Sequence, residues 1–256
     1  FFIVACTNTK LANLQKIESR IFKSIPEIQL PKDNVPSKRL EIPVGDRTLI
    51  ANWVSTDNRA PAFFILHGNG ETLSDWRPLQ SYLLEKGYSS FVFDYSGFST
   101  GKMTASNFNQ DAIEAYKTFA TLTENTNQRI TFAHSLGTSI SLEVTNKLKP
   151  LPNKVIIHGA FTSLREILVE KKIIEKENVP DYPDTWNGLR SVKHIKAPLY
   201  ILHSQKDKAI PIYMSESLAK SAGSKAKFME INTTGHNDVY EFPNDSTWNQ
   251  IFSFIK

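Results

Sequence analysis

The feature that most constrains this chain is a serine between two small residues, where a strand-like run meets a helix-like run. The pentapeptide from Ala133 to Gly137 has Ser135 at its centre, after the apolar run 130–132 and before the helix-like run 139–148. On a sharp strand-to-helix turn a serine hydroxyl is exposed, and the flanking backbone approaches neighbouring elements so closely that only small side chains fit. Alanine at 133, where glycine is usual, adds crowding but leaves this interpretation intact. The alternative is an ordinary turn with a solvent-facing serine.

Two further residues with suitable chemistry follow the serine along the chain, each just after a strand-like run. Asp207 follows the run 199–204, and His236 follows the run 227–231. A nucleophilic serine needs a general base to take its proton, and the base needs a carboxylate to orient it. In open α/β sheets, sites form outside the carboxyl ends of the strands. The order Ser135, Asp207, His236 therefore predicts a catalytic triad at one edge of a sheet.

Other residues of the same types compete for these roles. Asp238 lies two residues from His236, which makes it awkward for orienting the far side of the ring. Asp94 also follows a strand-like run, but well before the serine. His134 is adjacent to the serine, and neighbours on such a turn point away from each other. We therefore expect Asp207 as the acid and His236 as the base, with Asp238 and Asp94 as the rival acids.

Beyond these residues, the chain resembles the α/β-hydrolase superfamily from about residue 40 to its C-terminus. Besides the pentapeptide and the acid and base positions, the resemblance rests on the strand and H-G-x-G turn at 63–70, the segment 91–101 and the exit into a small cap at 158–164. Phe98 stands where this family usually has glycine. The resemblance implies an oxyanion hole made by the backbone N–H groups of Asn69 and Leu136. It also implies a serine hydrolase that needs no metal and no organic cofactor.

Strand-like and helix-like runs alternate through most of the chain, which predicts an α/β fold with a mostly parallel central sheet and helices on both faces. A length of 256 residues suits one domain, expected at 39–256 with a small helical cap at 161–196. The early runs share a short turn and could add an antiparallel edge. The expected strands are 40–44, 48–54, 63–66, 90–94, 129–133, 155–158, 199–203 and 227–231, and the expected helices are 76–86, 107–122, 139–148, 214–222 and 247–255.

The cap contains an apolar helical face. Its members are Leu164, Ile167, Leu168 and Ile174. Packing of the cap onto the domain is the stronger explanation of this face, but an apolar surface over the serine would also favour acyl chains. Small-capped members of the superfamily include esterases, protein thioesterases and monoglyceride lipases.

We therefore expect a small-molecule or lipid-like acyl ester or thioester as the substrate. A serine peptidase of the aminopeptidase type is an alternative, although the cap shows no acidic cluster for a free amine. A non-catalytic binding module is another, although the triad is complete. The net charge of +4 is too small and too dispersed to predict nucleic-acid binding. The oligomeric state stays open.

The first 38 residues differ from the rest and are expected to form a tether or a docked segment. The run from Ile3 to Cys6 resembles a bacterial lipobox, in which the cysteine becomes the lipidated N-terminus; a short apolar strand is the alternative. Lipidation of Cys6 would place the enzyme on a bacterial membrane, facing the periplasm; without it the cytoplasm is the better location. Apolar residues at helical spacing predict a docked helix rather than a membrane span, because no apolar run approaches ~20 residues. These residues are Leu14, Ile17, Ile21 and Ile25.

Overall fold

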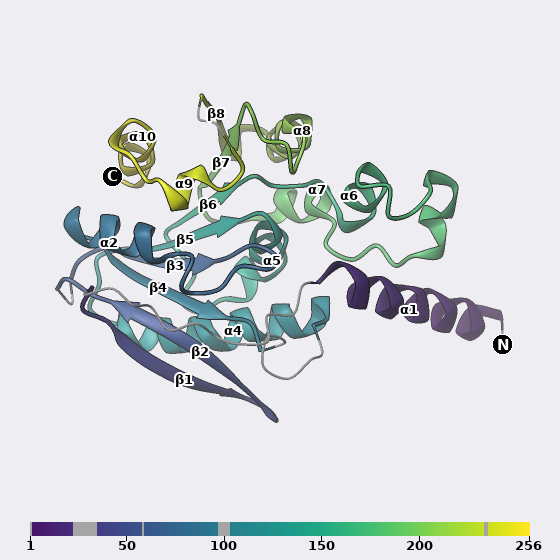
Figure 1. Cartoon of the computed structure of the whole chain (residues 1–256), viewed down its shortest axis with the longest axis horizontal. Helices are drawn as coiled ribbons and strands as arrows, with labels where there is room; N and C mark the ends of the chain where they lie inside the picture. Colours follow the sequence, from purple (N-terminus) through teal and green to yellow (C-terminus); the bar gives the residue numbers. More distant parts are fainter. Residues whose placement is uncertain (1, 23–34, 58, 97–102, 233–234) are drawn as a thin grey trace.

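The core of the protein is one eight-stranded sheet (Figure 1). The structure is a computed structural model that describes residues 2–22, 35–57, 59–96, 103–232 and 235–256, with backbone alone for residues 2–10. The strand order is β1-β2-β4-β3-β5-β6-β7-β8. The strands are β1 (Lys38–Val44), β2 (Arg47–Val54), β3 (Ala62–Leu66), β4 (Ser89–Asp94), β5 (Arg129–His134), β6 (Lys154–His158), β7 (Leu199–Ser204) and β8 (Ala226–Ile231).

The sheet is antiparallel at one edge and parallel elsewhere. β1 and β2 form a hairpin, and β2 pairs antiparallel with β4, whereas every pairing from β4 through β3 to β8 is parallel. A parallel strand covered on both faces is apolar throughout, and all five residues of β3 are buried. The expected strands, including the antiparallel edge, are confirmed to within one or two residues.

Helices cover both faces of the sheet, because successive side chains of each strand point to opposite sides. Phe64 packs in one buried cluster with α4, α5 and α8, while Phe63 packs in a second cluster with α2 and α10. The α-helices are α1 (Phe2–Ile21), α2 (Arg77–Glu85), α4 (Ala105–Leu122), α5 (Leu136–Val144), α6 (Leu164–Glu170), α7 (Gly188–Ser191), α8 (Ile212–Ala222), α9 (Asp238–Glu241) and α10 (Asp245–Ile255). Short 3-10 helices are η1 (Thr145–Lys147), η2 (Lys176–Asp181), η3 (Val192–His194) and η4 (Gly223–Lys225).

The N-terminal segment is helical, so the alternative of a short apolar strand at Cys6 is wrong. α1 includes Cys6 and extends away from the sheet at its N-terminal end (Figure 1). Its other end packs on the domain: Ile17 is buried, and the buried Glu18 accepts a hydrogen bond from the backbone N–H of Ala105 at 2.8 Å. Ile25 lies outside the described residues. Among the helices described, none is both long enough and apolar enough to cross a membrane.

Just beyond α1, Phe22 packs between α4 and Trp186. Its ring meets that of Phe108 edge-on at 4.9 Å and lies 5.9 Å from the indole of Trp186. Asn13 adds a hydrogen bond from its amide to the carbonyl of Asp181 in η2. The end of α1 therefore contacts both α4 and the region of the cap.

The cap helix is shorter than its apolar pattern predicts. α6 ends at Glu170, because Lys172 adopts a left-handed conformation with φ of 55° and the backbone N–H of Ile173 turns back to the carbonyl of Leu168. Ile174 is buried but lies outside the helix. The expectation that it continues one helical face is therefore wrong.

Candidate active site

Ser135 occupies a strained turn between β5 and α5. Its φ and ψ are 51° and −118°, a combination that non-glycine residues rarely adopt. Its backbone N–H donates to the carbonyl of His158 at 3.0 Å, which ties the turn to β6. From residue 130 to residue 142, Ser135 is the one residue that is not buried. The local fold thus leaves Ser135 half-buried, while the residues on either side of it along the chain are buried.

Gly137 shows why the turn needs a small residue after the serine. A Cβ atom at this position would lie 2.2 Å from the carbonyl oxygen of Leu66 at the end of β3. No side chain fits at that distance from backbone, so Gly137 permits the close packing of α5 against β3. On the other side of the serine, Ala133 is fully buried within β5.

Asp207 and His236 lie within hydrogen-bonding distance, as their positions after strands predict. Asp207 follows β7, and its Oδ2 is 2.6 Å from Nδ1 of His236. Its other oxygen accepts hydrogen bonds from the backbone N–H groups of Ala209 and Ile210 at 2.7 and 2.8 Å. Burial raises the pKa of Asp207, but His236 and the Ile210 amide outweigh this effect and hold that pKa below its ordinary value. An ionised Asp207 would fix Nδ1 of His236 as the protonated nitrogen and leave Nε2 as the base.

Gly159 is a site residue that the sequence analysis did not single out. It follows β6 with φ of 62°, and a Cβ there would lie 2.9 Å from Cε1 and 3.1 Å from Nδ1 of His236. The glycine therefore leaves room for the His236 ring beside Asp207. A glycine directly after a strand is the signal that could have identified it.

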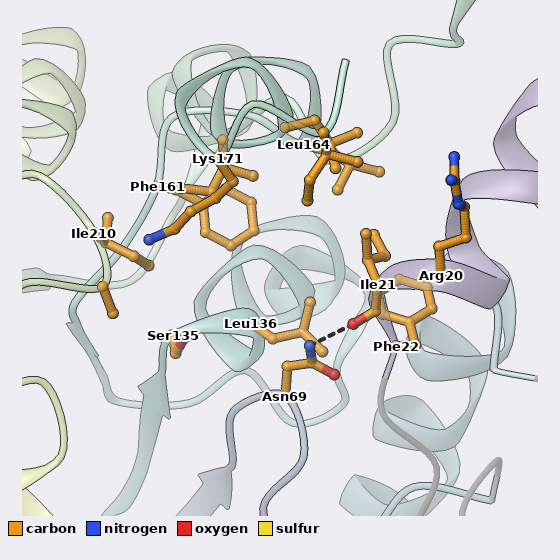
Figure 2. Close-up of a pocket in the computed structure, with 14 residues that line it drawn as sticks. Arg20, Ile21, Phe22, Asn69, Ser135, Leu136, Phe161, Leu164, Lys171 and Ile210 are labelled. Atoms are coloured by element: carbon orange, nitrogen blue, oxygen red, sulfur yellow. Dashed lines mark hydrogen bonds between the residues drawn. The ribbon is translucent and has the colours of Figure 1, made fainter.

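The residues expected to form the oxyanion hole lie beside the serine. Asn69 and Leu136 line the same cavity as Ser135 (Figure 2). The turn that carries Asn69 is held at two points. The backbone N–H of Gly68 donates to Glu71 at 2.7 Å, and the side-chain amide of Asn69 donates to the carbonyl of Ile21 in α1 at 2.7 Å.

The two rival acids make other contacts. Asp238 accepts a hydrogen bond from the backbone N–H of Gly235 at 2.9 Å, which shapes the turn before His236. Asp94 accepts one from the backbone N–H of Leu73 at 2.6 Å. The residues 97–102 that follow Asp94, including Phe98, lie outside the described residues.

A buried histidine, His134, lies next to the His236 ring and is itself contacted by His158 and Glu71, a cluster that the sequence alone did not bring together. The ring of His134 is 4.5 Å from that of His236, and its Nδ1 is 3.1 Å from Nδ1 of His158. On its other side, Nε2 of His134 is 3.5 Å from a carboxyl oxygen of Glu71. Glu71 also accepts hydrogen bonds from Gly68 and from the indole of Trp76. One carboxyl group thus contacts both the turn that carries Asn69 and the histidine beneath His236.

Burial controls the charge of this cluster. It lowers the pKa of His134 well below its ordinary value, with neighbouring His236 and His158 adding to the effect, and it lowers the pKa of His158 to about 3. Burial raises the pKa of Glu71 to about 7, against the opposing hydrogen bonds from Gly68 and Trp76. Burial thus keeps the two imidazoles neutral, and it lets the carboxyl group of Glu71 titrate near neutral pH.

His203 forms a second support, on the Asp207 side. Its Nε2 is 2.9 Å from the carbonyl of Ile210 and 3.5 Å from Oδ2 of Asp207, and its Nδ1 is 2.7 Å from the hydroxyl of Ser215. Burial lowers the pKa of His203, which favours the neutral ring. In that form its N–H points toward the loop that holds Asp207.

A cavity of about 470 Å³ opens at Ser135. Pockets of this size, apolar with a few polar groups, are typical of small-molecule sites. Leu164, Ile167 and Leu168, which the sequence analysis proposed as substrate-binding residues, all line it. α1 forms another wall, which the sequence analysis did not foresee. The remaining lining residues are Arg20, Ile21, Phe22, Asn69, Leu136, Phe161, Lys171, Ile173, Ala209 and Ile210.

Two other expectations concern metals and Cys6. Within the described part of the chain, no group of three or more His, Cys, Asp or Glu residues could hold a metal ion. Cys6 lies in α1, and its side chain is outside the described features. Its lipidation stays a prediction.

Known proteins with similar sequences include lipases. The family model described as alpha/beta hydrolase fold matches residues 61–169. The lysophosphatidylserine lipase ABHD12 of Xenopus tropicalis is 28% identical over 177 residues, which cover 62% of this chain and 46% of that protein. The uncharacterized protein YfhR of Escherichia coli is 26% identical over 216 residues, which cover 80% of this chain and 75% of that protein. The chain spans about half the length of the ABHD12 proteins that it matches.

Solved structures share the fold at low sequence identity. An esterase from Pyrococcus furiosus, Pf2001, matches with a TM-score of 0.69 and 14% identity, covering 91% of this chain and 98% of that one. An acylaminoacyl peptidase from Pyrococcus horikoshii matches with a TM-score of 0.69 and 14% identity, covering 87% of this chain and 42% of that one. Together with the strand order and the family-model match, these similarities show that the chain has the α/β-hydrolase fold.

Proposed function

We propose that this protein is a serine hydrolase that cleaves carboxylic esters or thioesters of apolar acyl groups. One observation carries the proposal: Ser135 lies on a strained turn at the end of β5 and lines the cavity, in the sheet whose β7 leads into Asp207. Asp207 is in turn hydrogen-bonded to His236 at 2.6 Å. A nucleophile, a base and an orienting acid placed at strand ends are the requirements for acyl transfer through a covalent intermediate.

The acylation step follows from these positions. His236 Nε2 takes the proton of the Ser135 hydroxyl as its oxygen attacks the carbonyl carbon of the substrate. The carbonyl oxygen gains the negative charge, and the backbone N–H groups of Leu136 and Asn69 are the donors proposed to stabilise it. When the tetrahedral intermediate collapses, His236 gives the proton to the leaving alcohol or thiol. The product is an ester between Ser135 and the acyl group.

Deacylation repeats these steps with water as the nucleophile. His236 takes a proton from water, the resulting hydroxide attacks the acyl-enzyme, and the same two amides stabilise the second oxyanion. Collapse returns the proton to Ser135 and releases a carboxylic acid. Asp207 stays ionised and compensates the charge of the His236 imidazolium in both steps.

The cavity favours an acyl ester over a peptide. Its walls are mostly apolar, and neither Asp nor Glu is among its described lining residues, so it offers no carboxylate for a free amino terminus. Among the relatives, ABHD12 is named as a lipase. The peptidase with the same fold remains the competing activity.

Labelling with a fluorophosphonate probe tests the nucleophile. The wild-type protein should be labelled, and Ser135→Ala should not. Ser246→Ala, which removes an exposed hydroxyl from α10, serves as the control and should be labelled like wild type. Equal labelling of Ser135→Ala and wild type would overturn the assignment.

The substrate class needs a separate comparison. Hydrolysis of p-nitrophenyl esters with short to long acyl chains should be measured beside aminoacyl anilides. We expect turnover of the esters, rising with acyl length until the cavity is filled, and little turnover of the anilides. Preference for the anilides would favour the peptidase.

A further inference from the structure

The cavity at Ser135 carries an uneven distribution of charge. Of its described lining residues, two are cationic, Arg20 and Lys171, and none is anionic. Figure 2 shows that the two lie at opposite ends of the cavity: Lys171 reaches in from the end of α6 on the side of Ser135 and Ile210, whereas Arg20 lies on α1 beyond Ile21. Between them the walls are apolar.

Lys171 is held at this position by its backbone. It follows the last residue of α6, and its N–H donates to the carbonyl of Ile167 at 2.9 Å, within the turn closed by the left-handed Lys172. The side chain itself is exposed and forms no ion pair with the described residues. The nearest acid along the chain, Glu170, accepts a hydrogen bond from Tyr213 instead.

A lysine at an exposed helix end is most often a solvated surface charge. Lys171 differs because its chain crosses apolar surface, between Phe161 and Ile210, and ends at the cavity (Figure 2). Low-dielectric walls focus the field of this ammonium toward an anion that enters the cavity.

We propose that Lys171 binds an anionic group, a phosphate or a carboxylate, on the leaving-group side of the substrate. This inference rests on the proposed function. The position of the leaving group in the cavity follows by elimination. The acyl chain is expected along the apolar walls that run from Leu136 past Leu164 toward Ile21, and the alcohol or thiol then lies at the other end, beside Lys171 (Figure 2). The preferred substrate is thus an acyl ester of an anionic alcohol or thiol.

Three esters of one medium-length fatty acid test this assignment, each dispersed in a neutral detergent. The neutral member is the glycerol ester, and the anionic members are the corresponding esters of glycerol phosphate and of glyceric acid. In wild type, kcat/KM should be higher for at least one anionic ester than for the neutral ester, and the two anionic esters separate phosphate from carboxylate recognition.

Lys171→Gln should lower the ratio of anionic to neutral kcat/KM by roughly three- to tenfold, a range between an exposed ion pair and a charge-assisted hydrogen bond. The loss should appear mainly as a higher KM for the anionic ester. Added salt should also lower the ratio of anionic to neutral kcat/KM in the wild-type protein. Lys172→Gln is the matched control, because Lys172 is adjacent and exposed but does not line the cavity; its ratio should equal that of wild type.

Each outcome has one meaning. An unchanged ratio in Lys171→Gln, with all esters still hydrolysed, overturns the inference and leaves the proposed function standing. If Arg20→Gln loses the preference for anionic esters and Lys171→Gln keeps it, the anion binds at the other end of the cavity. That result also overturns the inference. If the folded wild-type protein hydrolyses none of the esters, the proposed function itself is wrong.

Discussion

The ends of the strands and the walls of the cavity meet at Ser135, but they are built differently. At the strand ends, the backbone N–H groups of Ser135, Gly159 and Asp207 all donate hydrogen bonds to backbone carbonyls, and a Cβ at Gly159 would lie 2.9 Å from the His236 ring. The cavity walls come from α1, α6, the start of α5 and several loops, and they include exposed side chains such as Arg20 and Ile173.

This difference separates two kinds of effect. Changes at the strand ends should reduce kcat for every substrate, because in the proposed mechanism they alter groups that act in the transition state. Changes in the cavity walls should act on KM and on the choice of substrate. A wall substitution that removed all turnover, or a strand-end substitution that changed only KM, would break the distinction.

The largest effect is expected from Asp207→Asn. An asparagine amide would favour the wrong tautomer of His236, and loss of this function in serine triads costs about 10⁴-fold in kcat. Asp238→Asn is the comparison, because Asp238 shapes the preceding turn through Gly235, and its effect should be much milder. Steady-state kinetics on one ester, with circular dichroism to check folding, measure both. A greater loss in Asp238→Asn would assign the acid to Asp238.

Glu71→Gln should change the pH dependence of stability. Because burial raises the pKa of Glu71 from 4.5 to about 7, the folded protein keeps a proton that the unfolded chain releases, and this group makes stability fall as pH rises from about 4.5 to about 7. The fall amounts to about 3 kcal/mol at 1.36 kcal/mol per pKa unit.

Urea denaturation between about pH 4.5 and pH 7 measures this fall in the free energy of unfolding. The difference in unfolding free energy between wild type and Glu71→Gln should change by roughly this amount, with wild type losing relative stability toward high pH. Asp94 also has a raised pKa, but it is present in both proteins and cancels from the difference. Parallel pH profiles for the two proteins would show that Glu71 titrates normally.

Gly159→Ala tests how tightly the strand ends are packed around His236. The added Cβ would meet the His236 ring at 2.9 Å in a backbone conformation with φ of 62°, so the ring must move away from its present position beside Asp207. A misplacement of about 1 Å can cost roughly 10²-fold in rate. Kinetics should show the loss in kcat. Unchanged kcat would mean that the ring relaxes without leaving its productive position.

The strand ends were also the part that the sequence could predict. Ser135, Asp207 and His236 each follow a strand-like run, and the period of the apolar residues locates those runs. The sheet and its antiparallel edge follow from the same pattern. Gly159, Glu71 and His134 were missed as a group because they meet through contacts between segments far apart in the sequence, such as the 3.5 Å approach of His134 to Glu71.

The cavity was predictable only in part. The apolar spacing of Leu164, Ile167 and Leu168 indicated one wall, although it extended the helix too far, to Ile174. For α1, the spacing of Ile17 and its neighbours indicated a docked helix. Spacing carries no information on the partner, so the contact between the Ile21 carbonyl and Asn69 could come only from the tertiary structure.

The smallest effect is expected from Ile21→Ala, which thins the wall that α1 contributes. Ile21 is half-buried and lines the cavity, and its backbone hydrogen bond to Asn69 does not depend on its side chain. Loss of contact with an acyl chain should cost about 1 kcal/mol, or roughly fivefold in KM for long-chain esters, with kcat and short-chain esters little affected. Leu11→Ala is the control, since Leu11 lies on the same helix, is 52% exposed and does not line the cavity. Equal effects of the two variants, or equal effects on short and long esters, would mean that α1 supports the fold without contacting the substrate.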